Sequence, residues 1–177
     1  MKRAKSAFVV PLLLLLATVC VDLANAAGEA DPTFNASAYG ELSNQGIVNV
    51  VRLQADGKIL VGGQFTEVQG FGASGLARLN ADGTVDSSFN PPDFYGFNPN
   101  TGATVVGGEI LAIVVQADGK IIVGGNIRGA NGDGKAGIRR LNPDGSVDTS
   151  FTILQLSIGS VVYDMDLQAD GKIVIGG

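Results

Sequence analysis

The sequence predicts an all-β fold in which four-stranded antiparallel units repeat along the chain. A ten-residue string, QADGKILVGG in its first copy, recurs with small changes from Gln54, Gln116 and Gln168. A second block of the form RLNxDGxVDxSF follows the first two copies at the same distance, from Arg78 and Arg140. Because the blocks keep their order and spacing, each unit is expected to fold as one structural object.

Asp-Gly pairs predict two β-hairpins in each unit. Each pair lies between apolar runs, and Asp-Gly is the preferred pair of the tight type I′ hairpin turn. Aspartate in such a turn bonds its own backbone two residues on, so the turn explains these residues without a ligand. The predicted structural turns are Asp56 and Gly57, Asp82 and Gly83, Asp118 and Gly119, Asp144 and Gly145, and Asp170 and Gly171.

The first strand of each unit is expected to bury one face. Val51, Ile113 and Met165 occupy equivalent positions on a mostly apolar face. The opposite face carries Arg52, Val114 and Asp166 at one equivalent position. Because its residues vary so freely between copies, this second face is expected to be less buried.

A pair of glycines closes the second strand of each unit, at 62–63, 124–125 and 176–177. Glycine within a strand marks a bulge or the close approach of another backbone. A phosphate-binding loop is the functional alternative, but neither the GxGxxG nor the P-loop spacing surrounds these pairs. The sequence therefore favours a structural role for the paired glycines.

Units of about 50 residues with four antiparallel strands have the size of β-propeller blades. The succession of a DxxFN element, a QxDGKIxxGG hairpin and an RLNxDGxVDxSF hairpin, from Ala30 onward, resembles the bacterial delta-60 repeat family. This resemblance implies a secreted β-propeller of unknown function and brings no catalytic residues with it.

The expected fold is thus a β-propeller-type array of four-stranded antiparallel blades. Its units are predicted at about 36–90, 91–152 and 153–177, the last one partial. Propeller rings use about four to eight blades, so the chain is expected to be an N-terminal fragment with about two and a half blades. Further blades are expected downstream of Gly177.

The N-terminus has the pattern of a secretory signal peptide. Basic residues precede an apolar run at 7–21, and the triplet Ala24–Ala26 places the predicted cleavage after residue 26. We therefore expect a secreted, extracellular protein with no membrane span after cleavage. A retained anchor is the alternative, as is a lipid on Cys20, although Val19 stands where a lipoprotein signal has a small residue.

Composition excludes several kinds of chemistry. The chain has no histidine, and its one cysteine lies in the predicted signal peptide, so disulfides, Cys or His metal sites and Ser-His-Asp triads are not expected in the mature chain. The net charge is −5 and no unit presents a basic run, which argues against nucleic acid as a partner. No cofactor is expected.

Candidate binding residues lie where the copies differ. The insertion at 90–108 combines three prolines with Phe94, Tyr95 and Phe97, which could anchor a partner, although a tolerated insertion is the simpler explanation. Asp164 and Asp166 replace uncharged or basic residues of the first two units. No metal site is predicted; Asn131 and Asp133 are weak candidates, because Lys135 stands where another oxygen ligand would be needed.

The predicted function is that of a secreted, non-catalytic binding or adhesion scaffold at the cell surface or in the extracellular matrix, with a protein or glycan surface as its ligand. The alternative is an extracellular polysaccharide-acting enzyme with a carboxylate site on the propeller axis, formed by residues such as Asp164 and Asp166. A third possibility is a spacer within a larger extracellular protein.

Overall fold

The computed structural model describes residues 38–39, 46–97, 104–106, 108–130, 137–152, 156 and 160–177. The chain divides into two compact units, Met1–Asp31 and Pro32–Gly177, and every described residue belongs to the second. The predicted signal peptide and the weak metal candidates Asn131 and Asp133 lie outside the described residues.

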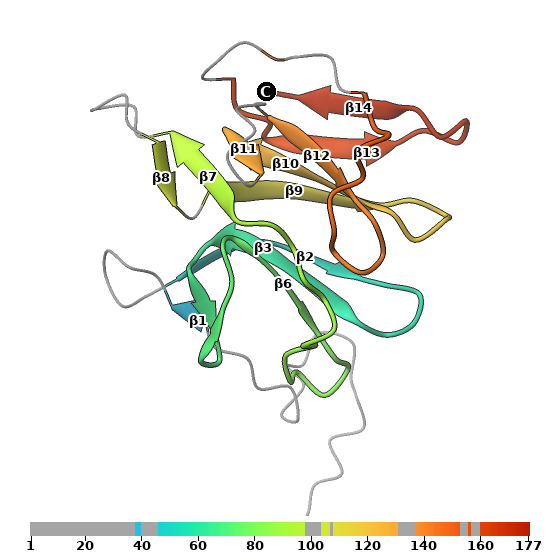
Figure 1. Cartoon of the computed structure of the whole chain (residues 1–177). Coiled ribbons are helices and arrows are strands. Elements are labelled where there is room, and N and C mark those ends of the chain that lie inside the picture. Colours follow the sequence, from blue (N-terminus) through green and yellow to red (C-terminus); the bar gives the residue numbers. More distant parts are fainter. Residues whose placement is uncertain are drawn as a thin grey trace, which may run out of the picture. The chain divides into compact units, whose positions relative to one another are not determined.

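All regular structure in the described residues is β, and the repeats form three antiparallel sheets (Figure 1). The first sheet has the order β2-β3-β6 and the second β9-β10-β12, while the third contains β13 and β14. Their bounds are β2 Ile47–Leu53, β3 Ile59–Gln64, β6 Leu76–Leu79, β9 Glu109–Val115, β10 Ile121–Asn126, β12 Ile138–Leu141, β13 Asp164–Leu167 and β14 Ile173–Gly176.

Two small sheets are formed by connecting segments. One joins β1 (Ala38–Tyr39), β4 (Glu67–Val68) and β5 (Phe71–Gly72) in the order β1-β4-β5. The other joins β7 (Phe94–Phe97), β8 (Thr104–Val106) and β11 (Gly129–Ala130) in the order β11-β7-β8. The insertion therefore contributes a β-hairpin of its own, β7 with β8.

The fourth strand of each complete unit is very short. It consists of one bridge, Leu79 with Val85 in the first unit and Leu141 with Val147 in the second. The outer strand ends at once because Asp86 turns the chain, accepting hydrogen bonds at Oδ1 from the backbone N–H and the hydroxyl of Ser88. The all-β, propeller-type arrangement is as predicted, with its outermost strand reduced to this bridge.

The Asp-Gly pairs lie in turns, but the type I′ prediction is wrong. In a type I′ turn both central residues need positive φ. The glycines have it, with φ near 83° at Gly57, whereas among the described non-glycine residues positive φ occurs only at Gln69. Asp56 instead accepts the N–H of Lys58 at Oδ1, 3.1 Å away. This is a type I turn followed by a left-handed glycine, which closes a three-residue hairpin loop.

The two glycines of each pair have different roles, and both agree with the prediction. A Cβ on Gly63 would collide with the carbonyl oxygen of Ile47, at the register shift between Val48 and Val50. This glycine therefore permits the β-bulge. A Cβ on Gly62 would lie 2.7 Å from Cγ2 of Ile110 in the next unit, so this glycine lets two sheets pack closely.

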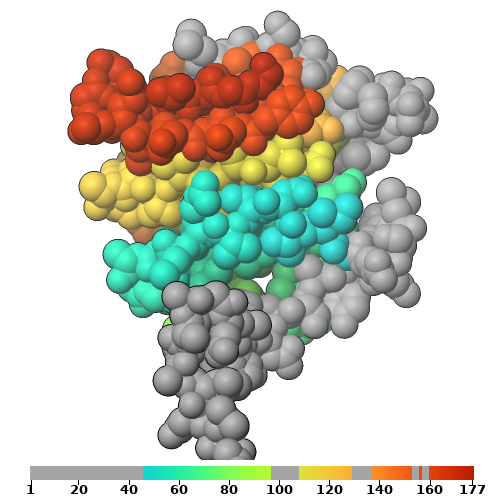
Figure 2. All heavy atoms as spheres, turned by 180° about the vertical axis from the view of Figure 1, so that it is seen from behind, coloured from blue at the N-terminus to red at the C-terminus, as the bar shows by residue number. Residues whose placement is uncertain are grey.

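The sheets stack face to face, with β9 in contact with β2 and β3 on one side and with β13 on the other. From behind, the hairpins of the three repeats form successive cyan, yellow and red bands (Figure 2). One apolar cluster, which includes Leu60, Ile113 and Val123, fills the first contact, and a second, which includes Ile122 and Met165, fills the next.

Because the second sheet is covered on both sides, the prediction of one less buried face is wrong for this unit. Ile113 is inaccessible to solvent and Val114, on the opposite face, is only 9% exposed. In the first unit the pattern is reversed: Val51 is 52% exposed, whereas Val50 is buried against the second sheet. No helix in the described residues is long and apolar enough to cross a membrane.

Candidate functional site

The first complete unit contains a buried ion-pair cluster centred on Asp86. Its Oδ2 accepts hydrogen bonds from Nε of Arg78 at 2.7 Å and from Nζ of Lys58 at 2.5 Å. The guanidinium of Arg78 also stacks on the ring of Phe89, 4.5 Å from its centre. Burial raises the pKa of Asp86, but the hydrogen bonds from Lys58 and Ser88 outweigh it and hold the pKa well below its usual range.

The second unit repeats this cluster around Asp148. Lys120 and Arg140 both donate to Oδ2 at 2.8 Å, and Arg140 stacks on Phe151 at 4.4 Å. The hydrogen bond from Lys120, followed by that from Ser150, lowers the pKa of Asp148 well below its usual range. We call this arrangement of lysine, arginine, aspartate and phenylalanine the latch, because it ties the outer turn of each unit to its first hairpin.

In the latch, Lys58 and Lys120 are more than solvated strand residues. Their side chains keep 31% and 28% of their surface exposed, and each binds an aspartate 28 residues further along the chain. Lys172, the third copy, is 76% exposed and pairs with Asp170 of its own turn. The copied charged residues of the two complete units therefore serve the fold.

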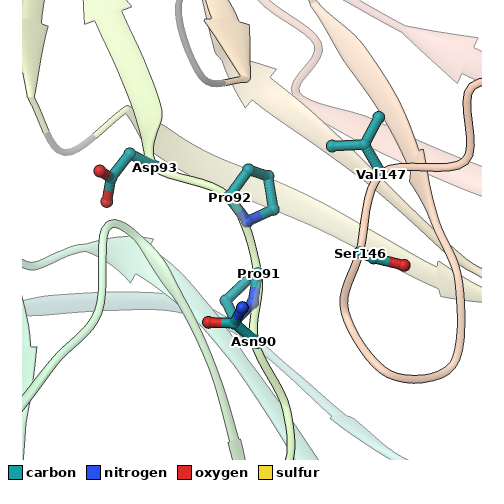
Figure 3. Close-up of a pocket in the computed structure, with 6 residues that line it drawn as sticks. All are labelled: Asn90, Pro91, Pro92, Asp93, Ser146 and Val147. Carbon is teal, nitrogen blue, oxygen red and sulfur yellow. The ribbon is translucent and has the colours of Figure 1, made fainter.

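A hollow of about 430 Å³ lies where the insertion begins. Figure 3 shows the segment that follows the first unit facing a loop of the second across this space. Asn90 donates its backbone N–H to the Asp144 carbonyl at 2.9 Å, and Asp93 accepts a 2.7 Å hydrogen bond from the Ser74 hydroxyl. The lining residues are Asn90, Pro91, Pro92, Asp93, Ser146 and Val147.

This hollow offers a mixed surface to a ligand. Asn90, Asp93 and Ser146 are exposed and supply an amide, a carboxylate and a hydroxyl, while half-buried Pro91 and Val147 supply apolar surface. Hydrogen bonds from Thr84 lower the pKa of Asp82, and hydrogen bonds from Ser146 lower the pKa of Asp144. The sequence pointed to the insertion but not to Ser146 and Val147, which the fold brings to Asn90 and Asp93 from more than 50 residues away.

Two of the three candidate aromatic residues of the insertion, Phe94 and Tyr95, have described side chains. Phe94 is inaccessible to solvent and belongs to the apolar core between the first two sheets, so the expectation that its ring anchors a partner is wrong. Tyr95 is half-buried on β7, and its carbonyl accepts the N–H of Arg128 at 2.7 Å. The side chain of Phe97 lies outside the described part of the structure.

Asp164 and Asp166 lie two residues apart on β13 and are both exposed. The Oδ1 of each accepts the backbone N–H of the next residue, at 2.9 and 2.8 Å. Their cross-strand partners on β14 are Gly176 and Val174. The two carboxylates thus share one open sheet face, far along the chain from the hollow. Among the residues described, no group of three or more metal-binding side chains occurs.

Stacked antiparallel sheets of one repeated design, with the same turns and paired glycines in all three and the latch in the first two, define the class of β-propeller repeat proteins. Residues 54–89 and 116–151 match the family described as a β-propeller domain of unknown function (DUF5122). These two repeats belong to this family, and the resemblance to the delta-60 repeat is confirmed. Neither a curated protein nor a solved structure matches the chain.

Proposed function

We propose that the protein is a secreted, non-catalytic binding scaffold whose ligand, a glycan or a protein surface, docks at the hollow beside the insertion. The observation that carries this proposal is a contrast: the polar groups of the latch are paired with one another, whereas those of the hollow are exposed. Asp86 and Asp148 are buried and neutralised by their own lysine and arginine, whereas Asn90, Asp93 and Ser146 are exposed.

The chemistry of the hollow suits a ligand rich in hydroxyl or amide groups. An amide, a carboxylate and a hydroxyl offer both donors and acceptors. Pro91 and Pro92 stiffen the backbone here, which lowers the entropy lost when a ligand binds. Function placed in a loop on a rigid repeated frame is the usual arrangement in such folds.

Export is part of this proposal and rests on the sequence. The basic start, the apolar run and the small residues at Ala24 and Ala26 match a secretory signal. An acidic chain without a basic run suits an extracellular partner better than a nucleic acid. The N-terminal sequence of the protein recovered from the medium would test export directly, since it should begin at Ala27.

Binding is tested with the purified full chain on arrays of glycans, matrix polymers and host-cell proteins. We expect binding to a defined ligand class, and loss of that binding in a chain with both Asn90→Ala and Asp93→Ala. A matched control, Asp56→Asn, changes an exposed aspartate outside the hollow and should bind normally. If no array component binds, or if the double variant binds as well as the unmodified chain, the hollow is not the site.

A second candidate, an enzyme acting on polysaccharides, rests on the carboxylates of β13. Asp164 and Asp166 share one exposed face, and a pair of carboxylates is the minimum that general acid–base cleavage of a glycosidic bond requires. Exchanging both for Asn distinguishes the two functions. Hydrolysis that disappears in this variant supports the enzyme, whereas array binding that is unchanged supports the scaffold.

A further inference from the structure

A second hollow, of about 190 Å³, adjoins the hollow beside the insertion. Asn90, Pro91 and Asp93 line both, so residues 90–93 form a shared wall, which we call the strip. In Figure 3, Ser146 lies on one side of the strip and the carboxylate of Asp93 extends to the other. One ligand can therefore reach both hollows by crossing the strip.

The second hollow lies at the outer edge of β6. It touches Leu76, Ala77 and Arg78, three consecutive residues of that strand. Because consecutive side chains of a strand point to opposite faces, a hollow that touches all three lies at an edge of the strand. The other edge of β6 is paired with β3. The units stack through the faces of their sheets, so a further unit stacked in the same way would cover a face and not this edge.

The walls of the second hollow are held together by hydrogen bonds. On one wall, Gly75 donates its N–H to the Phe65 carbonyl at 2.9 Å, which holds the backbone next to Ser74. The Ser74 hydroxyl then donates to Oδ1 of Asp93 in the strip at 2.7 Å and so joins the two walls. The Oδ2 of Asp93 takes no part in this bond. Walls that are already in place reduce the entropy lost when a ligand binds.

The lining of the second hollow combines aromatic rings with polar groups. Phe71 lines it and is 53% exposed, whereas Phe89 lines it and is buried. Ser74, Asn90 and Asp93 supply a hydroxyl, an amide and a carboxylate. An exposed aromatic ring beside such groups suits a sugar, whose ring carbons pack on the aromatic face while its hydroxyls exchange hydrogen bonds with the polar groups.

Charge and size narrow the ligand further. Arg78 and Asp86 line the second hollow but are paired with each other at 2.7 Å, whereas Asp93 bonds a neutral hydroxyl. A uronate or sulfate group brought to the strip would be repelled by the Asp93 carboxylate. A volume of 190 Å³ is below the range of about 300–1,000 Å³ for a small-molecule site, so the second hollow fits one part of a larger ligand.

We propose that the ligand is an uncharged glycan chain that crosses the strip and places successive sugar units in the two hollows. This inference rests on the proposed function and adds to it the class of ligand, its extended form and the contacts with Phe71 and Ser74. A chain of linked sugar rings is narrow and elongated, so it reaches both hollows, whereas a single sugar occupies one of them.

Calorimetric titration of the full chain with uncharged oligosaccharides tests the proposal. The probes are cello-, manno- and chito-oligosaccharides of increasing length, starting from the single sugar. Affinity for the oligosaccharide that binds should rise about tenfold or more from the single sugar to the chain that spans both hollows, and should then level off. Uronate oligomers of the same lengths should bind about tenfold more weakly.

Variants at Phe71 test the second hollow by itself. Phe71→Leu keeps an apolar side chain but removes the ring, and should weaken binding of the longer oligosaccharides about threefold to tenfold. Phe71→Tyr keeps the ring and should bind like the unmodified chain. Tyr163→Leu is the matched control, because Tyr163 is 66% exposed and lines neither hollow. Ser74→Ala gives a second, independent test of the same hollow, and circular dichroism shows that each variant keeps the fold.

This inference and the proposed function fail in different ways. If a protein on the arrays binds through Asn90 and Asp93 while no oligosaccharide binds, the proposed function stands and the glycan chain is overturned. Affinity that does not depend on chain length, uronate oligomers that bind as tightly as uncharged ones, or Phe71→Leu and Ser74→Ala variants that both bind normally also overturn it. An absence of binding to every array component removes both.

Discussion

Arg78 and Asp86 form a 2.7 Å ion pair in which both side chains are more than nine-tenths buried. The same guanidinium donates from Nη1 to the Pro143 carbonyl of the second unit at 2.6 Å. One arginine therefore holds the outer turn of its own unit and the turn of the next. In this fold the latch both closes a unit and connects it to its neighbour.

Replacing Asp86 by Asn should destabilise the protein. The variant keeps an acceptor for Ser88 but leaves two cations facing a neutral amide, one of them Arg78, only 9% exposed. We expect a loss of about 2–3 kcal/mol in the free energy of unfolding, below the range for a fully buried pair because Lys58 remains partly in solvent. Urea unfolding measures it. Asp56→Asn, in an exposed turn, is the control, and an equal effect of both variants would contradict the role of the latch.

Acid should unfold the protein through the same carboxylates. The folded-state pKa values of Asp86 and Asp148 are lowered, so the native state binds fewer protons than the unfolded state once the pH is near the usual aspartate value of about 4. Their contribution to stability is fully present above that pH and is lost as the pH falls below it. Urea midpoints measured at a series of pH values should show this decline, and Asp86→Asn should make it shallower. A decline between pH 7 and 5 would point to other groups.

Gly62→Ala should be costly although alanine is a better strand residue. Its Cβ would lie 2.7 to 2.9 Å from side chains of Val50, Ile110 and Ile113, which are packed in the core. We expect a loss of about 1–3 kcal/mol from overpacking. Gly72→Ala, where a Cβ meets open space, should change stability by no more than about 0.5 kcal/mol. Thermal unfolding of both variants gives the comparison, and equal melting temperatures would show that the sheets separate easily.

Repetition made most of the fold predictable from the sequence. Each hairpin is defined by a local pattern, Asp-Gly between apolar runs, that needs no distant contact to be recognised. Burial of individual faces was less predictable, because it depends on what covers a sheet. Val114 is buried by the third unit and Val51 is exposed on the first, although both belong to strands of the same pattern. The type of the turns was mistaken because Asp56 bonds the N–H of Lys58 and keeps negative φ.

The candidate site was only partly predictable for the same reason. Phe94 looked like a loop residue, but the insertion folds into its own hairpin, whose first side chain enters the core between two sheets. The latch was missed although its residues are copied together: lysine, arginine, aspartate and phenylalanine recur at the same distances in both complete units. That joint recurrence is the signal that could have found it, because residues that must touch are kept as a set.

Hydrogen exchange should show the third unit opening before the second. The strand β10 pairs with β9 and β12 and is buried along most of its length, whereas β14 pairs with β13 and is largely exposed. Lys172 binds Asp170 of its own turn, so this unit has no latch among the described residues. Stability in repeat arrays is the sum of unit and contact terms, and a unit with fewer contacts opens more often. Amides of β14 should therefore exchange faster than those of β10. Equal protection of the two strands would mean that the described units unfold as one body and that stacking, rather than the latch, controls their stability.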